Sequence, residues 1–394
     1  MDAPGRLPVY LDYAATTPVD PRVAERMAAH LTLDGTFGNP ASRSHVYGWE
    51  AEEAVEAARV EVASLLNCDP REIVWTSGAT EADNLAIQGV ALAREDEGRH
   101  IVTSRIEHKA VIDTCAWLET RGWEVTWLDP GPEGRVAPEQ VAAALREDTV
   151  LVSLMLVNNE LGVVTDVEGV ARVLEDSPAL LHVDGAQALA KMPIDLASLG
   201  VDLMAFSGHK LYAPKGIGVL YVRNAPEVRL TPIIHGGGHE RGRRSGTLPT
   251  HQIVGFGSAC AIADAELAEE AGRIAALRDR FLDGLSNLPG VHLNGHPEAR
   301  IPGIVNLAFE DVDGEALLMA LAPDVACSSG SACNSAFVEP SFVLRGIGLD
   351  DALAQASLRF SFGRFTSEAD VEHAVSRVCE TVTRLRGAER ARSG

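Results

Sequence analysis

Lysine is scarce in this chain of 394 residues, whose lysines and arginines together number 34. The lysines are Lys109, Lys191, Lys210 and Lys215. A reaction that depends on a lysine amine therefore has four candidate positions, and no more.

Positively charged residues are outnumbered by negatively charged ones, and the formal net charge is −22. Nucleic acids and anionic membrane surfaces favour Lys and Arg, so direct binding to either is not expected. No apolar stretch is long enough to cross a membrane, and residues 1–6 contain no apolar signal segment. We therefore expect a cytoplasmic protein.

Cysteine pairs are also missing. The six cysteines include no C-x-x-C pair, and they are too sparse for a disulfide framework in a chain of this length. We expect reduced thiols, one of them reactive, and no metal site.

From about residue 72, short apolar runs alternate with helical periods. The runs predicted as strands are 73–76, 101–103, 125–128, 150–157, 180–183, 203–206 and 218–222. The segments predicted as helices between them are 80–93, 109–120, 138–146 and 166–175. This alternation predicts an α/β domain with a mostly parallel seven-stranded sheet, whose ligands bind at the carboxyl ends of the strands.

The rest of the chain predicts a second, smaller α+β unit, and the length suffices for two cores. Helical patterns occupy 46–66 and 258–287. The segments assigned to the smaller unit are 291–293, 305–309, 317–321, 358–362 and a helix over 368–386. We expect a large domain at residues 17–260 and a small domain made of residues 1–16 and 261–394.

Lys210 is the most informative of the four lysines. It follows the predicted strand 203–206 through a Ser-Gly-His turn, and Asp184 ends the neighbouring predicted strand. A lysine and an acid at such strand ends can serve a pyridine aldehyde cofactor, because the amine forms a Schiff base and the carboxylate keeps the ring nitrogen protonated. The spacing alone leaves a solvated loop lysine as an equal alternative.

The segment 76–81, Thr-Ser-Gly-Ala-Thr-Glu, follows a predicted strand and opens a predicted helix. Its small residues let backbone N–H groups approach an anion, and the helix N-terminus adds a favourable dipole. An ordinary helix cap is the commoner explanation of such a segment. Together with Ser207 and His209, it forms half of a predicted phosphate site.

Three further positions have both a functional and an ordinary interpretation. His108 starts a predicted helix, where it can stack on a cofactor ring or act only as a surface residue. Asn159 follows a predicted strand and can reach a cofactor or substrate oxygen, or serve an ordinary turn. Arg359 lies on a predicted strand and can bind a substrate carboxylate or form a structural ion pair.

Two loops complete the set of candidates. The basic, glycine-rich loop 236–247 is either solvated or a subunit contact that brings Thr247 to a phosphate. Residues 327–336 are small apart from one asparagine, which predicts a flexible loop with Cys333 near its centre. A loop cysteine is usually inert, but a mobile loop on a Schiff-base enzyme raises the odds of a reactive thiol.

Together these motifs resemble the long-loop subgroup of the cysteine desulfurases, which belong to the pyridoxal phosphate-dependent class-V aminotransferases. The resemblance runs from Leu-Asp-Tyr-Ala-Ala-Thr-Thr-Pro at 11–18 to Phe365. Its other motifs are Ser-Gly-Ala-Thr-Glu at 77–81, Glu-His-Lys at 107–109, Val-Asp-Gly-Ala-Gln at 183–187, Ser-Gly-His-Lys at 207–210 and Ser-Ser-Gly-Ser-Ala-Cys at 328–333. One departure is Asn334, where the family often has threonine.

The resemblance implies the aspartate-aminotransferase-like fold of pyridoxal phosphate enzymes (fold type I), as a homodimer. It implies that Lys210 forms the Schiff base, that Asp184 holds the ring nitrogen, and that Cys333, on a small-domain loop at about 327–340, takes the sulfur. The further cofactor contacts implied are Ala79, Thr80, His108, Gln187, Ser207, His209 and, from the other subunit, Thr247. The substrate carboxylate is expected at Asn159 and Arg359.

The implied reaction converts L-cysteine to L-alanine and leaves the sulfur on Cys333 as a persulfide. His108 is a candidate for assisting deprotonation of the thiol, since attack needs a thiolate. The sulfur is then passed to an acceptor protein, such as an iron–sulfur scaffold. The alternative is a selenocysteine lyase, or another pyridoxal phosphate-dependent lyase or aminotransferase of the same fold.

Overall fold

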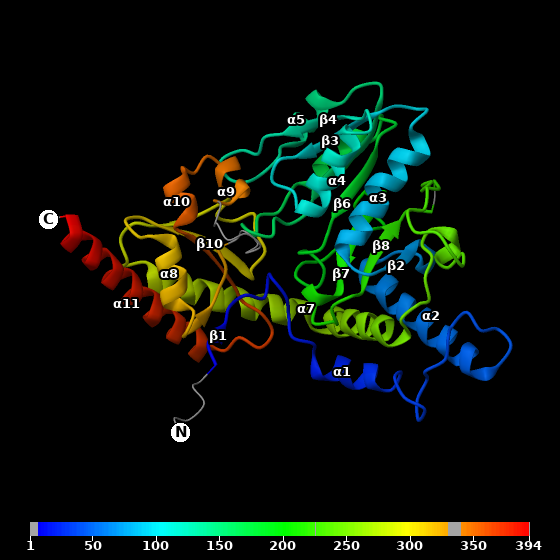
Figure 1. Cartoon of the computed structure of the whole chain (residues 1–394), viewed down its shortest axis with the longest axis horizontal. Coiled ribbons are helices and arrows are strands. Elements are labelled where there is room, and N and C mark those ends of the chain that lie inside the picture. The colour runs from blue at the N-terminus through cyan, green and yellow to red at the C-terminus, as the bar shows by residue number, and fades with distance from the viewer. Residues whose placement is uncertain (1–6, 225, 330–339, 394) are drawn as a thin grey trace.

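A seven-stranded sheet forms the centre of the larger half of the molecule (Figure 1). The computed structural model describes residues 7–224, 226–329 and 340–393, the last five of these by their backbone only. The strand order is β2-β8-β7-β6-β5-β3-β4, and β8 alone runs antiparallel to its neighbours, so the predicted, mostly parallel sheet is confirmed. The strands are β2 (Ile73–Thr76), β3 (His100–Ser104), β4 (Glu124–Leu128), β5 (Thr149–Met155), β6 (Leu180–Asp184), β7 (Leu203–Ser207) and β8 (Gly218–Val222).

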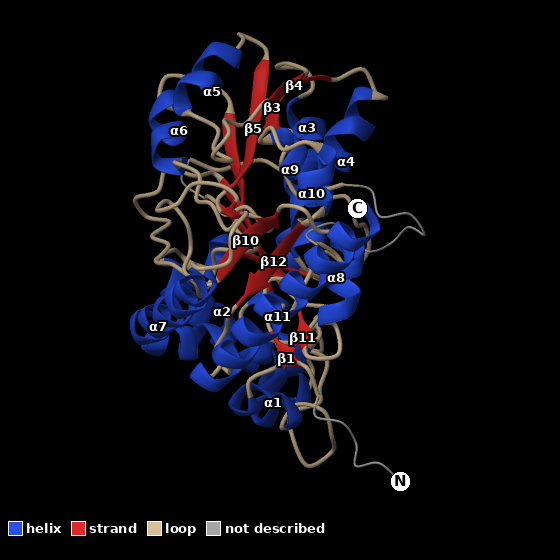
Figure 2. Cartoon of the chain, turned by 90° about the vertical axis from the view of Figure 1, so that its left-hand side faces the viewer, coloured by secondary structure: helices blue, strands red, loops and turns tan. Residues whose placement is uncertain are grey.

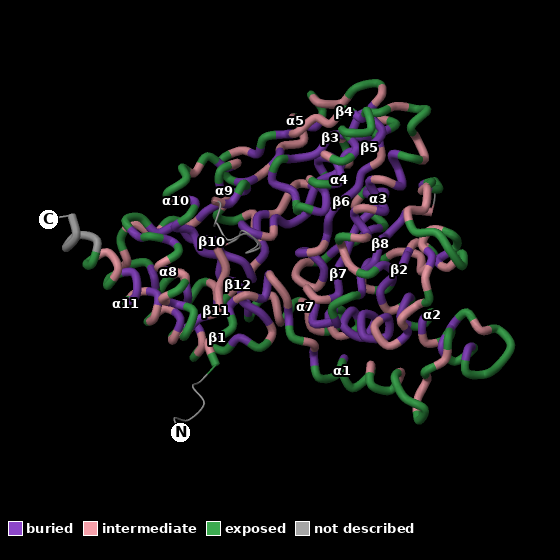
Figure 3. The backbone as a smooth tube through the Cα atoms, viewed as in Figure 1, coloured by how far each residue is buried: buried purple, intermediate pink, exposed green. Residues whose placement is uncertain are grey.

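Helices cover both faces of this sheet, which explains why its strands are continuous apolar runs rather than alternating ones (Figure 2). One face packs against α3 (Ala79–Arg94) and α4 (Lys109–Glu119). The helices that supply the core on the other face are α2 (Val46–Leu66), α5 (Pro138–Ala144), α6 (Val167–Leu174) and the first half of α7 (Thr250–Leu285). The buried strands lie between these two layers (Figure 3).

A second core surrounds a three-stranded antiparallel sheet, order β12-β10-β9. Phe281, Phe309 and Phe360 lie at its centre and are fully buried. The elements of this half are β1 (Val9–Tyr10), β9 (Val291–Leu293), β10 (Ile304–Phe309), α8 (Gly314–Leu321), β11 (Val325–Ala326), β12 (Ser357–Ser361) and α11 (Glu368–Ser393). β1 pairs with β11, so the start of the chain joins this unit.

Helix α7 belongs to both cores. Phe256 near its start packs into the core of the large sheet, and Phe281 near its end packs into the second core. The helix begins eight residues before the predicted 258 and runs unbroken past residue 260. The division into domains at that position therefore stays a prediction.

The short elements were the ones that the sequence pattern missed. One or two turns bury too few side chains to produce a periodic signal. The elements not predicted are the two-residue strands β1 and β11, the helices α1 (Pro21–Ala28), α9 (Phe342–Gly346) and α10 (Asp351–Gln355), and the 3-10 turns η1 (Pro70–Glu72), η2 (Gly208–Lys210) and η3 (Glu240–Gly242). None of the helices in the described ranges has both the length and the apolar composition that crossing a bilayer requires.

Candidate active site

A cleft of about 780 Å³ opens at the carboxyl ends of the central strands, between the two cores. Asp184 ends β6, Ser207 ends β7, and Ala79 and Thr80 open α3. The fold therefore brings to one place residues that are far apart in the sequence. The predicted site residues that line the cleft are Ala79, Thr80, His108, Asn159, Asp184, Gln187, Ser207, His209, Lys210 and Arg359.

Two predicted residues are not among those lining it. Cys333 lies outside the described residues, which resume at Pro340. Thr247 is exposed and does not line the cleft of its own chain. Its predicted role in the other subunit stays a prediction.

Lys210 is the lysine best placed for covalent chemistry. Its Nζ lies 2.6 Å from the Ala14 carbonyl and 2.7 Å from the Ala15 carbonyl, to both of which it donates. Burial, with a smaller effect from the Arg359 charge, lowers the pKa of Lys210 to about 8. Lys210 therefore needs a much smaller rise in pH than an ordinary lysine to become the neutral, nucleophilic amine.

The other lysines are less suitable. Lys109 is exposed and pairs weakly with Asp113. Lys215 is exposed at the rim of the cleft. Lys191 does not line the cleft, and its amine donates to Gln187 Oε1 at 2.5 Å. Only Lys210 combines a place in the cleft with a half-buried amine.

Asp184 lies at the base of the cleft, where it is buried. Its Oδ1 accepts a hydrogen bond from the Ala186 backbone N–H at 2.8 Å. Burial raises the pKa of Asp184, while His108 and Lys210 act in the opposite direction. A carboxylate so placed is suited to binding a protonated ring nitrogen.

The N-terminus of α3 is free to hold an anion. Its N-cap Gly78 has φ +154 and provides no side-chain cap, so the first backbone N–H groups face the cleft. A Cβ on Gly218 would lie 2.5 Å from the Gly78 Cα, so β8 and this turn pack backbone to backbone. The cradle is thus built from backbone donors and a helix dipole, which fits a phosphate group.

Ser207 and His209 also line the cleft, and a Cβ on Gly78 would lie 3.6 Å from Ser207 Oγ. His209 Nδ1 hydrogen bonds with Thr16 Oγ1 at 3.1 Å, which fixes the ring. Burial, followed by the charge of Lys210, lowers the pKa of His209 to about 4. The ring is therefore neutral and offers a phosphate a hydrogen bond rather than a full charge.

Gln187 is held in one orientation. Its Nε2 donates to the Ala14 carbonyl at 2.9 Å, and its Oε1 accepts from Lys191. Both hydrogen-bonding ends of the amide are therefore assigned. These two contacts fix the direction of the second hydrogen on Nε2, and this hydrogen is available to the hydroxyl of a cofactor ring.

Arg359 is a partly satisfied cation in the wall of the cleft. Its Nη2 donates to Asp12 Oδ1 at 2.9 Å and its Nη1 to the Asn159 carbonyl at 2.8 Å, while Nε has no partner among the described residues. A substrate carboxylate can therefore compete with Asp12 for a guanidinium that the backbone already holds in place.

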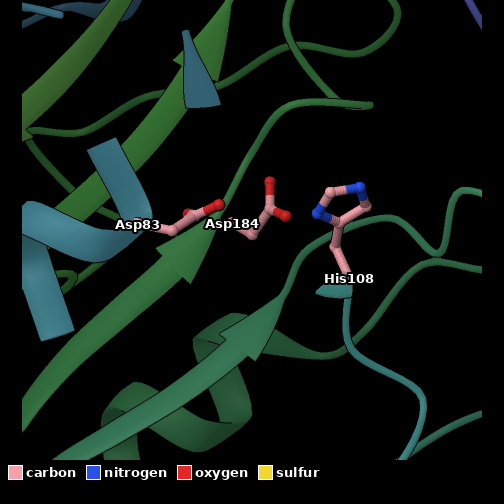
Figure 4. Close-up of side chains that lie close together, drawn as sticks. All are labelled: Asp83, His108 and Asp184. Atoms are coloured by element: carbon pink, nitrogen blue, oxygen red, sulfur yellow. The ribbon is translucent and has the colours of Figure 1, made fainter. Parts of the chain in front are cut away.

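His108 is the N-cap of α4, where its Nδ1 accepts from the Ala110 backbone N–H at 3.1 Å. Figure 4 shows its ring directed toward Asp184. The helix-start prediction is confirmed. The cap and a contact with a cofactor ring are compatible, because the cap occupies only one ring nitrogen.

Several residues around the cleft were not identified from the sequence. Asp12 lines the cleft. It belongs to the motif at 11–18, and this motif is the sequence signal that could have identified it. Asp83, Glu107 and His182 are buried behind Asp184 and form no local pattern. Their grouping depends on the packing of α3 against β6, which sequence periodicity does not reveal.

One cleft at the strand ends contains an amine with a lowered pKa, a buried carboxylate and an anion cradle. This combination defines the class of enzyme. This is a pyridoxal phosphate-dependent enzyme of fold type I. The chain belongs to the class-V aminotransferase family, whose family pattern it matches over residues 9–373.

Within that family, the chain is similar to cysteine desulfurases. It is 61% identical over 381 residues to cysteine desulfurase IscS of Pseudomonas putida (strain W619), covering 97% of this chain and 94% of the relative. Among solved structures, a NifS-like protein superposes with a TM-score of 0.90 at 37% identity, covering 96% of this chain and all of that one. The structure of SspA in complex with cysteine superposes with a TM-score of 0.81 at 38% identity, covering 91% of this chain and 99% of that one.

Proposed function

We propose that this protein is a cysteine desulfurase, which converts L-cysteine to L-alanine and retains the sulfur on Cys333 as a persulfide. The observation that carries the proposal is the cleft that joins Lys210, Asp184 and the α3 cradle. The high identity to cysteine desulfurases and the similarity to a cysteine-bound structure support this substrate.

Pyridoxal phosphate supplies an electrophilic carbon, and its protonated ring accepts the electron pair that the substrate releases. Lys210 would be the residue that holds the cofactor covalently, and its amine would also be the base for the proton on the substrate Cα. Asp184 would hold the ring nitrogen, while Ala79, Thr80, Ser207 and His209 would hold the phosphate.

The substrate is oriented by its carboxylate. Arg359 binds that carboxylate in place of Asp12, and the Asn159 side chain, beside it in the cleft, adds a neutral donor. His108, which also lines the cleft, would contact the cofactor ring.

The sulfur step needs a thiolate, and the described cysteines are poorly suited to it. Burial raises the pKa of Cys68, Cys115 and Cys327 to about 12, and it also raises the pKa of Cys260 and Cys379. All five are therefore neutral thiols at pH 7, and a thiol is a weak nucleophile. Cys333 is the remaining cysteine of the sequence.

The ends of the segment that contains Cys333 are fixed beside the substrate pocket. Ser328 pairs with Arg359 through the backbone at 3.1 and 2.6 Å, and Ser341 Oγ donates to Glu160 Oε2 at 2.5 Å. Cys333 is five positions after Ser328 in the sequence, and an extended chain covers at most about 18 Å over five positions. These anchors support a role for Cys333 at the cleft.

In the sulfur step, the Cys333 thiolate attacks the substrate Sγ. A new S–S bond forms, the substrate Cβ–Sγ bond breaks, and its electron pair stays on Cβ. Protonation of that carbon gives the methyl group of alanine. No external oxidant is needed, because the electron pair of the broken Cβ–Sγ bond reduces the substrate carbon while the two sulfur atoms are oxidised to the persulfide.

The product balance tests the proposal. Purified protein given L-cysteine and a thiol reductant should release alanine and sulfide in equal amounts. Pyruvate and ammonia in place of alanine would indicate β-elimination and would contradict the assignment. Turnover of L-selenocysteine without turnover of L-cysteine would favour the selenocysteine lyase alternative.

We further propose a homodimer, in which Thr247 completes the phosphate site of the other subunit. An exposed apolar surface supports this, because such surfaces mark association sites. It comprises Leu31, Leu33, Phe37, Val46, Tyr47 and Trp49. Figure 3 shows the exposed segment that leads into α2.

Sedimentation should therefore give twice the chain mass of 41.9 kDa. Introducing charge with Phe37→Glu and Trp49→Glu should produce monomers, and it should weaken cofactor binding if Thr247 acts across the interface. Trp117→Glu is the matched control, because Trp117 is an exposed tryptophan on α4. A dimer that survives the double substitution would contradict this interface.

The persulfide must pass to another molecule, and we propose a cytoplasmic sulfur-acceptor protein such as an iron–sulfur scaffold. The cysteine desulfurase IscS relatives support an acceptor of this kind. Incubating the protein with labelled cysteine and cell extract should label one acceptor preferentially. Labelling of small thiols alone would contradict a dedicated protein acceptor.

A further inference from the structure

A layer of buried ionisable residues lies directly behind Asp184. Asp83 on α3 and His182 on β6 are completely buried, and Glu107 precedes α4. Oxygens of Asp83 and Asp184 and a ring nitrogen of His108 all lie within 4.8 Å of one another. Figure 4 shows the Asp83 carboxyl directed toward Asp184.

Asp83 is an unusual residue in this layer, because neither of its oxygens has a hydrogen-bond partner among the described residues. An ionised carboxylate in such a site is strongly disfavoured. Burial, followed by the charges of Asp184 and Glu107, raises the pKa of Asp83 well above its usual range. Asp83 is therefore a neutral acid that carries a hydrogen.

His182 has a matching arrangement. Its Nδ1 lies 2.8 Å from Ser153 Oγ, and its Nε2 lies 3.5 Å from Asp83 Oδ1. Burial lowers the pKa of His182 to about 3, so the ring is neutral. In the tautomer in which Ser153 donates to Nδ1, the ring hydrogen is on Nε2, which is the nitrogen nearer to Asp83. The hydrogen of Asp83 is then free for a different acceptor.

Asp184 is the acceptor within reach. Glu107 accepts from Ser104 Oγ at 2.5 Å, and burial raises the pKa of Glu107 to about 8, so Glu107 is mostly neutral as well. Asp184 differs from both, because it accepts from the Ala186 backbone and faces His108 and Lys210. Asp184 is therefore the member of the cluster that has a backbone donor and neighbouring cationic groups to stabilise a negative charge.

We propose that Asp83 is a positioning residue for the cofactor: as a neutral acid, it donates a hydrogen bond to Asp184 and keeps Asp184 in the anionic form that a protonated ring nitrogen requires. Asp83 lies between His182, whose Nε2 is 3.5 Å from its Oδ1, and Asp184, one of whose oxygens is within 4.8 Å of an Asp83 oxygen. The proposed hydrogen bond forms when the Asp83 carboxyl closes this gap to Asp184. This inference rests on the proposed function only in its use of pyridoxal phosphate.

The test compares Asp83→Leu, which is apolar and of similar shape, with Asp83→Asn, which is a neutral donor. The readouts are the absorbance of the bound cofactor as a function of pH and the cofactor dissociation constant, neither of which requires turnover. A hydrogen bond to a charged group is worth a factor of about 10 to 100, so Asp83→Leu should weaken cofactor binding by at least about tenfold. Its absorbance transition should move by about one pH unit toward lower pH, because the ring proton is held less firmly.

Asp83→Asn should restore both quantities to within about threefold of the unaltered protein, because its amide also donates. If Asp83 acted as a charge, the asparagine variant would behave like the leucine variant, and the proposal would be overturned. Asp83→Ala serves the same comparison where the leucine variant does not fold.

Asp202→Asn is the matched control, because Asp202 is also a buried acid but lies at the opposite end of β6, where it accepts from the Leu181 backbone at 2.7 Å. It should lower the thermal midpoint without moving the absorbance transition. If Asp83→Leu also lowered the thermal midpoint without moving the absorbance transition, the role of Asp83 would be purely structural and the proposal would be overturned. Failure of the unaltered protein to bind pyridoxal phosphate would overturn this inference and the proposed function together, whereas β-elimination products would overturn only the latter.

Discussion

Replacing Lys210 with alanine should abolish the covalent attachment of the cofactor and lower turnover by at least about 10³-fold, because one amine serves as both attachment point and base. Borohydride treatment followed by mass spectrometry of the intact chain measures the attachment. The unaltered protein should gain the mass of the reduced cofactor, and the Lys210→Ala variant should not.

Lys215→Ala is the control for this experiment, because Lys215 also lines the cleft but is exposed at its rim. It should retain the covalent attachment. A cofactor mass that persists in Lys210→Ala and disappears in Lys215→Ala would show that the rim lysine carries the cofactor. The proposal that the lowered pKa of Lys210 marks the lysine that holds the cofactor would then be wrong.

Replacing Cys333 with alanine should leave the cofactor spectrum unchanged and eliminate the persulfide. Alanine production from cysteine should fall by at least about 10²-fold, because the substrate sulfur has lost its nucleophile while the cofactor site is intact. Alkylation of the persulfide and peptide mass spectrometry locate the sulfur. The pairing of an unchanged spectrum with a lost persulfide separates this result from simple unfolding.

Cys327→Ala provides the matched control for that variant. Cys327 is six residues earlier in the chain, and burial raises its pKa to about 12. It should therefore remain a thiol and contribute little to sulfur capture. A persulfide that forms normally in Cys333→Ala, or that vanishes in Cys327→Ala, would move the sulfur to another cysteine.

The central sheet and the strand ends were predictable because they depend on local patterns. The apolar runs that became β2 and β8 were located to the residue, since a strand buried on both faces has a continuous apolar sequence. Lys210 and Asp184 follow such runs directly, so their place at one edge of the sheet follows from the parallel topology. The anion cradle at 76–81 was predictable for the same reason.

The helix boundaries were predicted less well. Helix α7 starts at Thr250 and continues through both cores, because its two ends are stabilised by different apolar partners. Helix α11 extends to Ser393, beyond the predicted 386, although its last residues are polar. Such extensions depend on tertiary contacts and on intrinsic helix propensity rather than on an apolar stripe.

The sequence by itself determined the family, the order of strands and helices, and ten of the residues that line the cleft, because each depends on a motif or on the end of an apolar run. Only the tertiary structure showed what surrounds the two half-buried lysines: Lys191 donates to Gln187 and does not line the cleft, whereas Lys210 lines it and donates to two backbone carbonyls. It alone paired Arg359 with Asp12 across the molecule. It alone placed Asp83 and His182 behind Asp184, because burial and the resulting pKa shifts arise from packing between segments that are distant in the chain.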